Sequence, residues 1–355
     1  WVIDRHVDTD DFLIEDDEAG SLQYFLEDRQ TLYDENGPTV FATQIVKLRT
    51  IQAIEEAGTV QIQYNPAYQS YSIHHLKIWR DGKSIDVLPN VRVTQNSYNS
   101  ESNTHDHEGA NVLQLFISDL RRNDVIDFAH SITGQNTAYG NRTIGFNLAI
   151  AARDLNNVYR RYLIPKDRHL TFQYNGGHKL PSVTEENEHK IYEWSWDSIK
   201  QTVAEASVPI WYPAYPIVSF SDFNDWGEVQ SWATDLFSFE DETSSTVSEM
   251  ANQIIQGAVT QEEKLLAIFS FMQSEIRYVG LEIGRNGYRP FKPSLVLARR
   301  YGDCKDQTVL LRSLLKAVGI DAWSALVNSQ SGKVINNYGY SPISFNHAIV
   351  KAKIG

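Results

Sequence analysis

The sequence predicts an α+β protein in which a strand-rich N-terminal part is followed by a part that contains helices. Three observations support this prediction. Many short runs that alternate apolar and polar residues, separated by turn residues, precede residue 205. A proline-rich break follows at Pro209–Pro216. Beyond this break, apolar residues recur at the spacing of amphipathic helices.

The N-terminal part is predicted to form an antiparallel β-sandwich. Short alternating runs with turn residues between them are typical of strands that bury one face. Asp81-Gly82 follows one such run and is typical of a hairpin turn. The 18 Tyr, 15 Phe and 8 Trp of the chain also suit half-buried pleated surfaces. The predicted strands are Thr43–Thr50, Thr59–Tyr64, Ser72–Trp79, Val112–Ile117, Asp124–Ile132, Ile144–Ala151, His169–Tyr174, Lys190–Trp196 and Gln201–Val203.

A polar segment, Gln95–Ala110, interrupts these strands and predicts a long loop. It contains His105, Asp106 and His107, which are residue types that bind metals. Two histidines in a loop without a rigid frame lack the geometry of a metal site. We therefore interpret the segment as a solvated loop, and we predict neither a metal nor a cofactor for this chain.

The proline-rich break marks the expected domain boundary. Three prolines in eight residues cannot continue a helix or a central strand. We predict a strand-rich domain over residues 1–210, a linker over 211–220 and a second domain over 221–355. A chain of 355 residues is long enough for two domains.

Helical patterns begin directly after the break. Ser221 or Asp222 is expected to cap a first helix that runs through Leu236. Two further helices are predicted over Ser245–Gln256 and Gln261–Ser274. The apolar stripe of the last one is expected to face the core.

Composition excludes several classes of function. The chain has 32 Lys and Arg against 45 Asp and Glu, a formal net charge of −13, which disfavours nucleic acid as a partner. It has no run of about 18 apolar residues, so no membrane span is predicted. Its single cysteine excludes an intrachain disulfide and a cysteine-based zinc site.

The most informative segment is Tyr301–Thr308, which opens a strong predicted helix. Asp303 is expected to cap this helix and Gly319 to end it. Cys304 therefore falls in the first helical turn. The expected buried face consists of Leu310, Leu311, Leu314, Leu315 and Val318.

The first turn of a helix suits a nucleophilic cysteine. A thiol attacks as the thiolate, and its ordinary pKa of about 8.5 is lowered at helix N-termini and beside a protonated imidazole. First-turn backbone N–H groups are also expected to stabilise an oxyanion. The alternative is that Cys304 is a small buried apolar residue. The charged neighbours Asp303, Lys305 and Asp306 argue against that alternative.

A histidine follows the cysteine at a suitable position. Strands are predicted over Ala322–Asn328 and Ser344–Lys353, with a loop over Ser329–Pro342 between them. His347 lies on the second strand, 43 residues after Cys304. A strand packed beside the cysteine's helix can hold an imidazole against the sulfur. The alternative is a structural histidine that only makes hydrogen bonds.

These motifs resemble the bacterial transglutaminase-like superfamily, whose fold is papain-like. The resemblance covers about residues 261–355 and rests on Gly302–Asp306, Gly319–Ala322 and Phe345–Val350, with Ile276–Gly280 and Tyr288–Pro290 upstream. The preceding region resembles the domain of unknown function that comes before such cores in bacterial cell-envelope proteins. Leu120–Phe128 is its best matching piece.

The resemblance implies a Cys-His-Asp triad in which Cys304 and His347 match the first two members. In the family the Asp lies on the next strand, and the sequence after His347 contains no acid or amide. We therefore expect a core truncated at its C-terminal end that is weakly active or inactive by itself. Tyr278 is a candidate donor to the oxyanion, with a core role as the alternative. The resemblance also implies a periplasmic or cell-envelope location.

The predicted function is thiol-dependent acyl transfer on peptide, protein or amide substrates. Attack by water would make the full-length protein a cysteine protease or amidase, and attack by an amine would make it a transglutaminase. The resemblance favours hydrolysis. The alternatives are a non-catalytic cell-envelope binding or scaffold protein that uses the β-sandwich domain, and a structural module of envelope complexes. None of these functions requires a cofactor.

Overall fold

The structure is a computed structural model of the 355-residue chain. It describes residues 1–13, 20–97, 110–148, 151, 153–203, 207–209, 212, 215–239, 242–280 and 287–355. The described residues form two compact units: those of the first lie within 1–97 and 110–222, and those of the second lie within 223–355. The predicted α+β class is confirmed. None of the helices in the described ranges is both long and apolar enough to cross a membrane.

The first unit is built on one long sheet. Its eight strands, counted in the described residues, have the order β12-β13-β10-β1-β2-β8-β4-β5. Neighbouring strands are antiparallel except β1 and β10, which run parallel. The strands are β1 (Leu22–Asp34), β2 (Gly37–Leu48), β4 (Ser70–Arg80), β5 (Lys83–Asp86), β8 (Val125–Thr133), β10 (Leu155–Pro165), β12 (Ser182–Glu186) and β13 (His189–Ile199).

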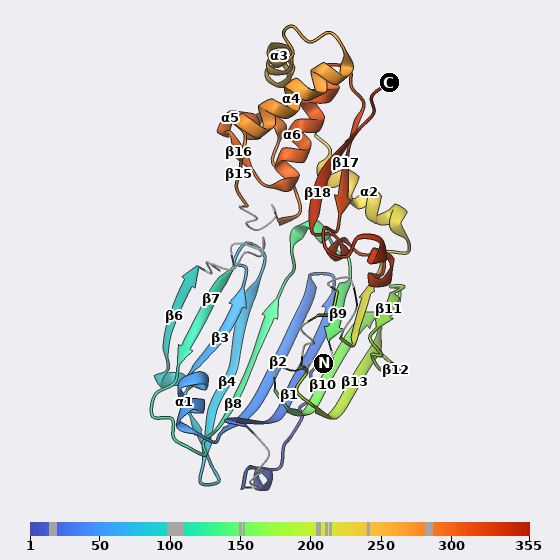
Figure 1. Cartoon of the computed structure of the whole chain (residues 1–355). Coiled ribbons are helices and arrows are strands. Elements are labelled where there is room, and N and C mark those ends of the chain that lie inside the picture. Colours follow the sequence, from blue (N-terminus) through green and yellow to red (C-terminus); the bar gives the residue numbers. More distant parts are fainter. Residues whose placement is uncertain are drawn as a thin grey trace. The chain divides into compact units, whose positions relative to one another are not determined.

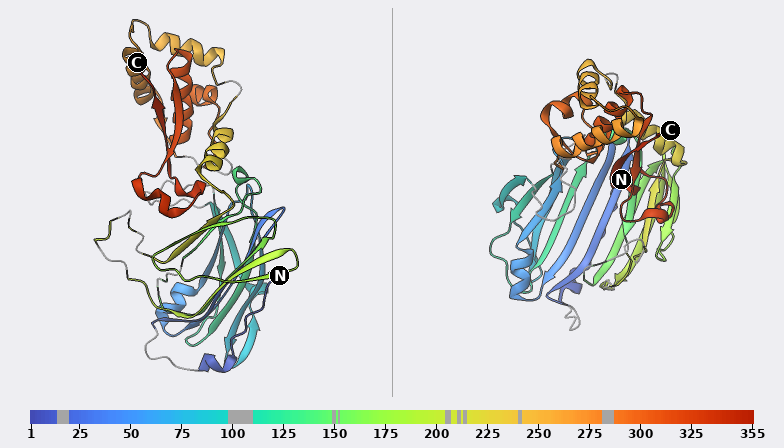
Figure 2. Two further views of the ribbon diagram at one scale, coloured as in Figure 1. Left: turned by 90° about the vertical axis from the view of Figure 1, so that its right-hand side faces the viewer. Right: turned by 45° about the horizontal axis from the view of Figure 1, so that its top comes forward.

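Two smaller sheets lie on one face of the long sheet, as Figure 1 and Figure 2 show. Their strand orders are β3-β7-β6 and β11-β14-β9. The strands are β3 (Thr59–Tyr64), β6 (Arg92–Ser97), β7 (Asn111–Phe116), β9 (Ile144–Leu148), β11 (Thr171–Asn175) and β14 (Ile217–Ser221). Helix α1 (Ile51–Ala57) joins β2 to β3, and short 3-10 helices cover Thr9–Leu13, Leu88–Asn90 and Thr137–Tyr139.

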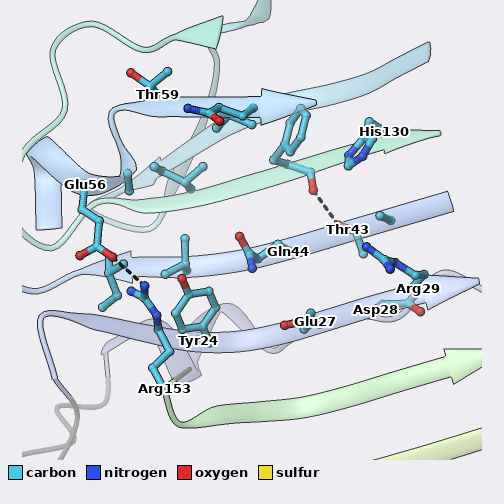
Figure 3. Close-up of a pocket in the computed structure, with 18 residues that line it drawn as sticks. Tyr24, Glu27, Asp28, Arg29, Thr43, Gln44, Glu56, Thr59, His130 and Arg153 are labelled. Atoms are coloured by element: carbon cyan, nitrogen blue, oxygen red, sulfur yellow. Dashed lines mark hydrogen bonds and ion pairs between the residues drawn. The ribbon is translucent and has the colours of Figure 1, made fainter. Parts of the chain in front are cut away.

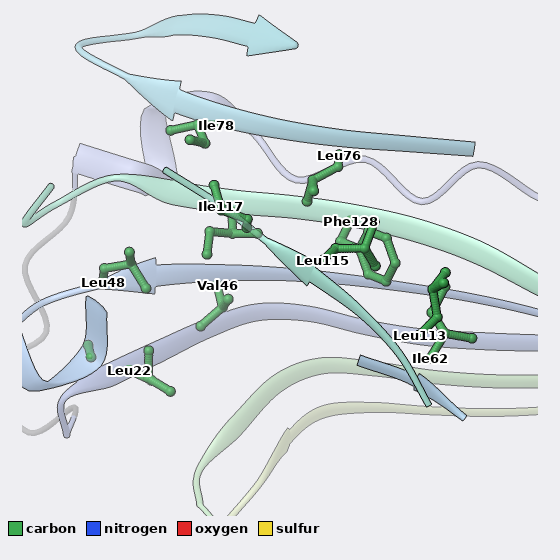
Figure 4. Packing of buried hydrophobic residues seen from close by; sticks show 12 residues of the cluster. Leu22, Val46, Leu48, Ile62, Leu76, Ile78, Leu113, Leu115, Ile117 and Phe128 are labelled. Carbon is green, nitrogen blue, oxygen red and sulfur yellow. The ribbon is translucent and has the colours of Figure 1, made fainter. Parts of the chain in front are cut away.

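The first small sheet packs on the long sheet through aliphatic side chains (Figure 4). Ile62 of β3 and Leu113 and Leu115 of β7 are buried against Leu76 and Phe128 of the long sheet. These residues occupy alternate positions, so each strand buries one face. This alternation is the pattern that predicted β3 and β7 from the sequence.

The second small sheet packs through aromatic side chains. The Tyr162 ring meets the rings of Trp194 and Phe220 edge-on, with centroids 5.8 and 5.0 Å away. Polar tips of the buried aromatics are hydrogen-bonded: Trp194 Nε1 donates to Lys179 O at 2.8 Å, and the Tyr33 hydroxyl donates to Ile144 O at 3.0 Å. Aromatic residues therefore supply much of this part of the core, as the composition indicated.

The N-terminal segment covers the opposite face of the long sheet. The Gln30 side chain accepts from Ile3 N at 2.9 Å and donates to Ile3 O at 2.7 Å, and Lys47 Nζ donates to Phe12 O at 2.9 Å. Asp28 accepts from Gln30 Nε2 at 2.8 Å, while its second carboxylate oxygen is buried and has no partner among the described residues. Burial therefore raises the pKa of Asp28 to about 6.

The expected boundaries of the linker and the long loop differ from the structure. The predicted linker over 211–220 contains most of β14, which pairs with β9 and β11 in the first unit. The division between the units therefore falls after Asp222. The predicted loop over Gln95–Ala110 begins within β6, and its His105, Asp106 and His107 lie outside the described residues.

The two central strands β1 and β10 were missed by the sequence analysis. The N-terminal segment packs on one face of the two strands, and neighbouring side chains bury much of the other face, where part of β1 also lines a groove. Their buried positions are consequently almost continuous rather than alternating. The alternation test therefore does not detect them.

The second unit is arranged around one central helix, α6 (Cys304–Ala317), as Figure 1 shows. On one side, Leu310 and Leu314 are fully buried against the other helices; on the other side, Val309 packs against Ala348 of a strand hairpin. The remaining elements are α2 (Trp226–Phe237), α3 (Ser245–Ile254), α4 (Gln261–Glu275), α5 (Pro293–Arg299), β15 (Arg277–Tyr278), β16 (Tyr301–Gly302), β17 (Ala322–Val327), β18 (His347–Ala352) and 3-10 turns at Gly332–Tyr338 and Pro342–Ser344.

The four predicted helices of this unit correspond to α2, α3, α4 and α6, whereas α5 was not predicted. The cap of α2 also differs from the prediction. Asp225 caps it by accepting from Glu228 N at 2.9 Å, because Ser221 belongs to β14 and the Asp222 carboxylate accepts from Thr143 N.

Replacing Asp28 by Asn should change the pH dependence of stability. The folded pKa of Asp28 is raised, so its contribution to stability is present below its unfolded pKa of about 4 and is lost as the pH rises through about 6. We expect Asp28→Asn to have nearly the wild-type Tm at pH 4 and a higher Tm at pH 7. Calorimetry across this range measures the difference; the exposed control Asp81→Asn should show no such trend. A constant Asp28→Asn difference at all pH values would contradict the linkage.

Candidate active site around Cys304 and His347

The start of α6 is fixed by a reciprocal cap, of which the sequence predicted the part that Asp303 plays. Asp303 Oδ1 accepts from the backbone N–H of Lys305 and of Asp306, each at 3.1 Å. The Asp306 carboxylate in turn accepts from Asp303 N at 3.4 Å. Cys304, between them, is the first helical residue and is partly exposed.

Asp306 connects this cap to the preceding chain. Its Oδ1 accepts from Phe291 N at 2.8 Å, and its Oδ2 forms an ion pair with Arg299. The Arg299 guanidinium also stacks on the rings of Phe291 and Tyr301, at 4.2 and 4.7 Å from their centroids. Burial and the nearby Asp303 charge raise the pKa of Asp306, whereas the Phe291 amide and Arg299 act in the opposite direction.

The charged neighbours of Cys304 are buried, contrary to the sequence-based expectation. Asp303, Lys305 and Asp306 are 2%, 4% and 2% exposed. Lys305 Nζ forms an ion pair with Asp303, which compensates both charges in the interior. Cys304 itself lies at the edge of a small apolar cluster that includes Val309. The premise that flanking charges keep this segment at the surface was wrong, although Cys304 is still not enclosed in an apolar core.

The cap also changes the expected oxyanion site. The N–H groups of Lys305 and Asp306 are engaged by the Asp303 side chain, and Gln307 N donates to Asp303 O at 2.9 Å. These three first-turn amides are therefore engaged within the cap, and the expectation that first-turn N–H groups stabilise an oxyanion does not extend to them. Tyr278 is not among the described residues that line the pocket at Cys304.

The position of His347 is set by the loop that precedes it. Asn346 Oδ1 accepts from Ser329 N at 2.9 Å, and Asn346 N donates to Val327 O at 3.1 Å. Asn328 Nδ2 donates to Ser344 O at 2.8 Å, which closes the same loop. The predicted strand therefore begins later, at His347, which pairs with Val327 across the hairpin. In the part of the chain that the structure describes, no group hydrogen-bonds the His347 imidazole.

Buried Arg312 joins the elements on which these residues stand. Its guanidinium donates to Ser324 Oγ of β17 at 2.9 Å and to Phe237 O at the end of α2 at 2.7 Å, and it forms an ion pair with Glu242. Because α6, β17 and α2 share this cation, their relative positions are fixed beside the site.

Cys304 and His347 line the same pocket, which has a volume of about 100 Å³. Trp232 of α2, Tyr288 and Phe345 supply aromatic walls, and the rings of Trp232 and Tyr288 meet at 5.9 Å. The sequence analysis did not assign these aromatic residues to the site. Trp232 lies far from Cys304 and His347 in the sequence, and Tyr288 was noted only as part of the Tyr288–Pro290 motif.

The comparisons with known proteins match the two units separately. Residues 36–202 match a domain of unknown function with solved structure, DUF3857. Residues 248–349 match the transglutaminase-like superfamily, and this range includes both Cys304 and His347. Among curated proteins, none is significantly similar to the chain.

Solved structures support the fold. The crystal structure of a candidate protease from Parabacteroides distasonis ATCC 8503 aligns with 95% of this chain at a TM-score of 0.75 and 16% identity. The chain spans 66% of that protein, and identity this low shows the fold alone. A candidate cysteine protease from Cytophaga hutchinsonii aligns with 94% of this chain and 75% of its own at 11% identity, but its TM-score of 0.25 supports no argument.

Gly302→Ala should open the cap of α6. A Cβ at this position would lie 2.5 Å from Asp306 Cβ and 3.0 Å from Asp306 Oδ2, so the carboxylate would have to move. We expect a loss of about 1–3 kcal/mol in the free energy of unfolding of the second unit, as is usual for overpacking. Chemical denaturation measures it. Gly280→Ala is the matched control, because its Cβ would meet no atom within 4 Å; equal stabilities of the two variants would contradict the role of Gly302.

Proposed function

From a chain that joins a DUF3857 domain to a transglutaminase-like core, we infer a thiol-dependent acyl-transfer enzyme with Cys304 as nucleophile and His347 as base. One observation carries this proposal. The only cysteine of the chain, at the first turn of α6, lines the same small pocket as a histidine at the first position of β18. The proposed location is the periplasm or cell envelope, for which family resemblance is the sole support.

The proposed reaction has two halves. His347 takes the proton of the Cys304 thiol, and the thiolate attacks the carbonyl carbon of an amide. The tetrahedral intermediate collapses to a thioester when the imidazolium gives its proton to the leaving amine. Water or a second amine then attacks the thioester, His347 takes its proton, and the thiol is restored. The acceptor decides between hydrolysis and cross-linking.

We propose hydrolysis of peptide or protein substrates as the primary outcome. Aromatic side chains that include Trp232, Tyr288 and Phe345 line the pocket at Cys304, and they would exclude water from part of the reacting centre. Family resemblance favours water over an amine as the acceptor. The expected third member of the triad is an acid that orients the imidazole.

One observation favours the alternative function, a non-catalytic binding protein. Neither ring nitrogen of His347 has a hydrogen-bonding partner in the described residues, and an imidazole without an orienting group is a poor base. The β-rich unit would then carry the activity. The two functions differ in what they require of Cys304, which is the basis of the test.

Alkylation of Cys304 tests whether the pair is functional. Since the chain has one cysteine, iodoacetamide labelling reports on that thiol alone. At pH 6 we expect Cys304 to react at least about tenfold faster than free cysteine, because an imidazole partner increases the thiolate fraction. His347→Ala should remove this advantage. Lys351→Ala, which changes an exposed residue on the same strand, should retain it.

Turnover separates the two acceptors. With a fluorogenic peptide library, Cys304→Ser should lower kcat/KM by more than about 10³-fold if the proposal holds. Added alkylamine should leave the products unchanged for a hydrolase and should appear in them for a transglutaminase. Identical alkylation rates with and without His347, together with no turnover by the full-length protein, would exclude the pair and support the binding function.

A further inference from the structure

The first unit contains a groove that is independent of the thiol site. It has a volume of about 470 Å³, within the range of about 300–1,000 Å³ typical of ligand pockets. Strands β1, β2 and β8 form its floor, and β3 and α1 form one wall (Figure 3). In Figure 1, β1 and β2 lie uncovered between the two small sheets. The second layer of the sandwich is therefore incomplete above the middle of the long sheet.

The floor changes from apolar to cationic along its length. The strand register aligns three rows of side chains across β8, β2 and β1. The row near α1 is apolar, the middle row is mixed, and the far row carries an arginine. From one end to the other, the rows are Ile126-Val46-Tyr24, Phe128-Gln44-Glu27 and His130-Ala42-Arg29.

The wall of the groove is the edge of a sheet. In the described residues β3 pairs only with β7. Gly58 O accepts from Ile117 N at 2.9 Å, and antiparallel bonding alternates along a strand. The N–H and C=O groups of Thr59, Gln61 and Gln63 therefore point away from β7. An unpaired strand edge of this kind is a template for another strand.

Among the described residues, the charges in the groove leave one cation, Arg29, without a partner. Glu27 forms an ion pair with Arg160, and Glu56 forms one with Arg153 at 2.7 Å. Arg29 is exposed and makes no ion pair or hydrogen bond with any described residue. Asp28 is adjacent in sequence, but its carboxylate bonds Gln30 on the opposite face of the sheet. A negatively charged ligand would therefore neutralise Arg29, even though the chain as a whole is acidic.

His130 adds a second polar group to the cationic end. It stacks on Phe128 at 5.1 Å, and its buried Nδ1 has no hydrogen-bonding partner in the described part of the chain. Burial and the nearby Arg29 charge lower its pKa to about 4, so it is neutral at physiological pH. The cationic end thus presents one charge, Arg29, beside a neutral imidazole that is not used by the fold.

We propose that this groove binds an extended acidic peptide segment, which adds to β3 as a strand and places a carboxylate against Arg29. A strand beside β3 would lie in the second layer, about 10 Å above the floor. Its alternate side chains would point down into the groove, where one of them meets Arg29. Backbone bonds to the β3 edge supply affinity, and the floor supplies preference for an acidic side chain.

The backbone part of the proposal is tested at Gln61. Proline at this position removes the outward N–H and leaves the bonds to β7 intact, because proline is tolerated on an edge strand when its nitrogen faces outward. Gln61→Ala keeps the N–H and is the matched control. The probe is a fluorescein-labelled, capped heptapeptide of alternating threonine and valine with one central glutamate, titrated into the full chain by anisotropy. We expect at least about tenfold weaker binding for Gln61→Pro and less than about twofold change for Gln61→Ala.

The charge part is tested at Arg29. Arg29→Gln should weaken binding of the glutamate peptide at least about fivefold and leave a glutamine version of the peptide unaffected. Lys83→Gln removes the same charge from an exposed hairpin strand outside the groove and should leave both affinities unchanged. If Arg29→Gln and Lys83→Gln weakened binding of the glutamate peptide equally, the attraction would be non-specific. That outcome would overturn the proposal.

Two further outcomes would also overturn it: no binding of the glutamate peptide, or wild-type affinity in Gln61→Pro. If Gln61→Pro does not fold by circular dichroism, a peptide N-methylated at alternate amides tests the same backbone bonds on the wild-type chain. Binding of that peptide at full affinity would exclude strand addition. All of these measurements use Cys304→Ser protein, so they are independent of the proposed acyl transfer.

Discussion

The candidate site depends on a set of charges that are buried at the start of α6. Asp303, Lys305, Asp306 and Arg299 are all removed from most of their water, so each must have a partner in the fold. The observed backbone arrangement gives all four a partner, and in it Cys304 is the first helical residue. Gly302 is part of the same constraint, because any Cβ there would displace the Asp306 carboxylate. The position of Cys304 is thus set by electrostatics that do not involve the thiol.

Local patterns predicted the parts of the structure that are determined locally. The cap at Asp303, the helix after it and the strand that carries His347 were all visible in short stretches of sequence. The hydrogen-bonding partners of the first-turn amides could not be predicted in this way. A local pattern does not tell whether an amide bonds to the side chain of Asp303 or to a substrate. Trp232 and Tyr288 were also not assigned, because only tertiary packing brings α2 beside the pocket. Strands buried on both faces lack the alternation on which the prediction relied.

The two units use polar groups in different ways. Around α6, polar side chains are paired inside the core, and they hold helices and strands in fixed positions. In the long sheet, Glu27 lines a groove and forms an ion pair with Arg160, while Arg29 in the same groove has no partner in the described residues. The first arrangement favours rigidity at a reacting centre. The second favours recognition, because the missing counter-charge can come from a ligand.

The parallel pairing of β1 with β10 has a consequence for how the first unit folds. The Arg160 side chain of β10 donates to the carbonyl of Glu27 of β1, although the two residues are 133 positions apart. During synthesis β1 leaves the ribosome long before β10 is made. The middle of the sheet therefore cannot form until a distant part of the chain has been synthesised. Closing such a large loop is slow, and until it closes, the unpaired edge of β1 can form non-native contacts. The slow step in the biogenesis of this protein is therefore expected at the β1–β10 junction of the first unit.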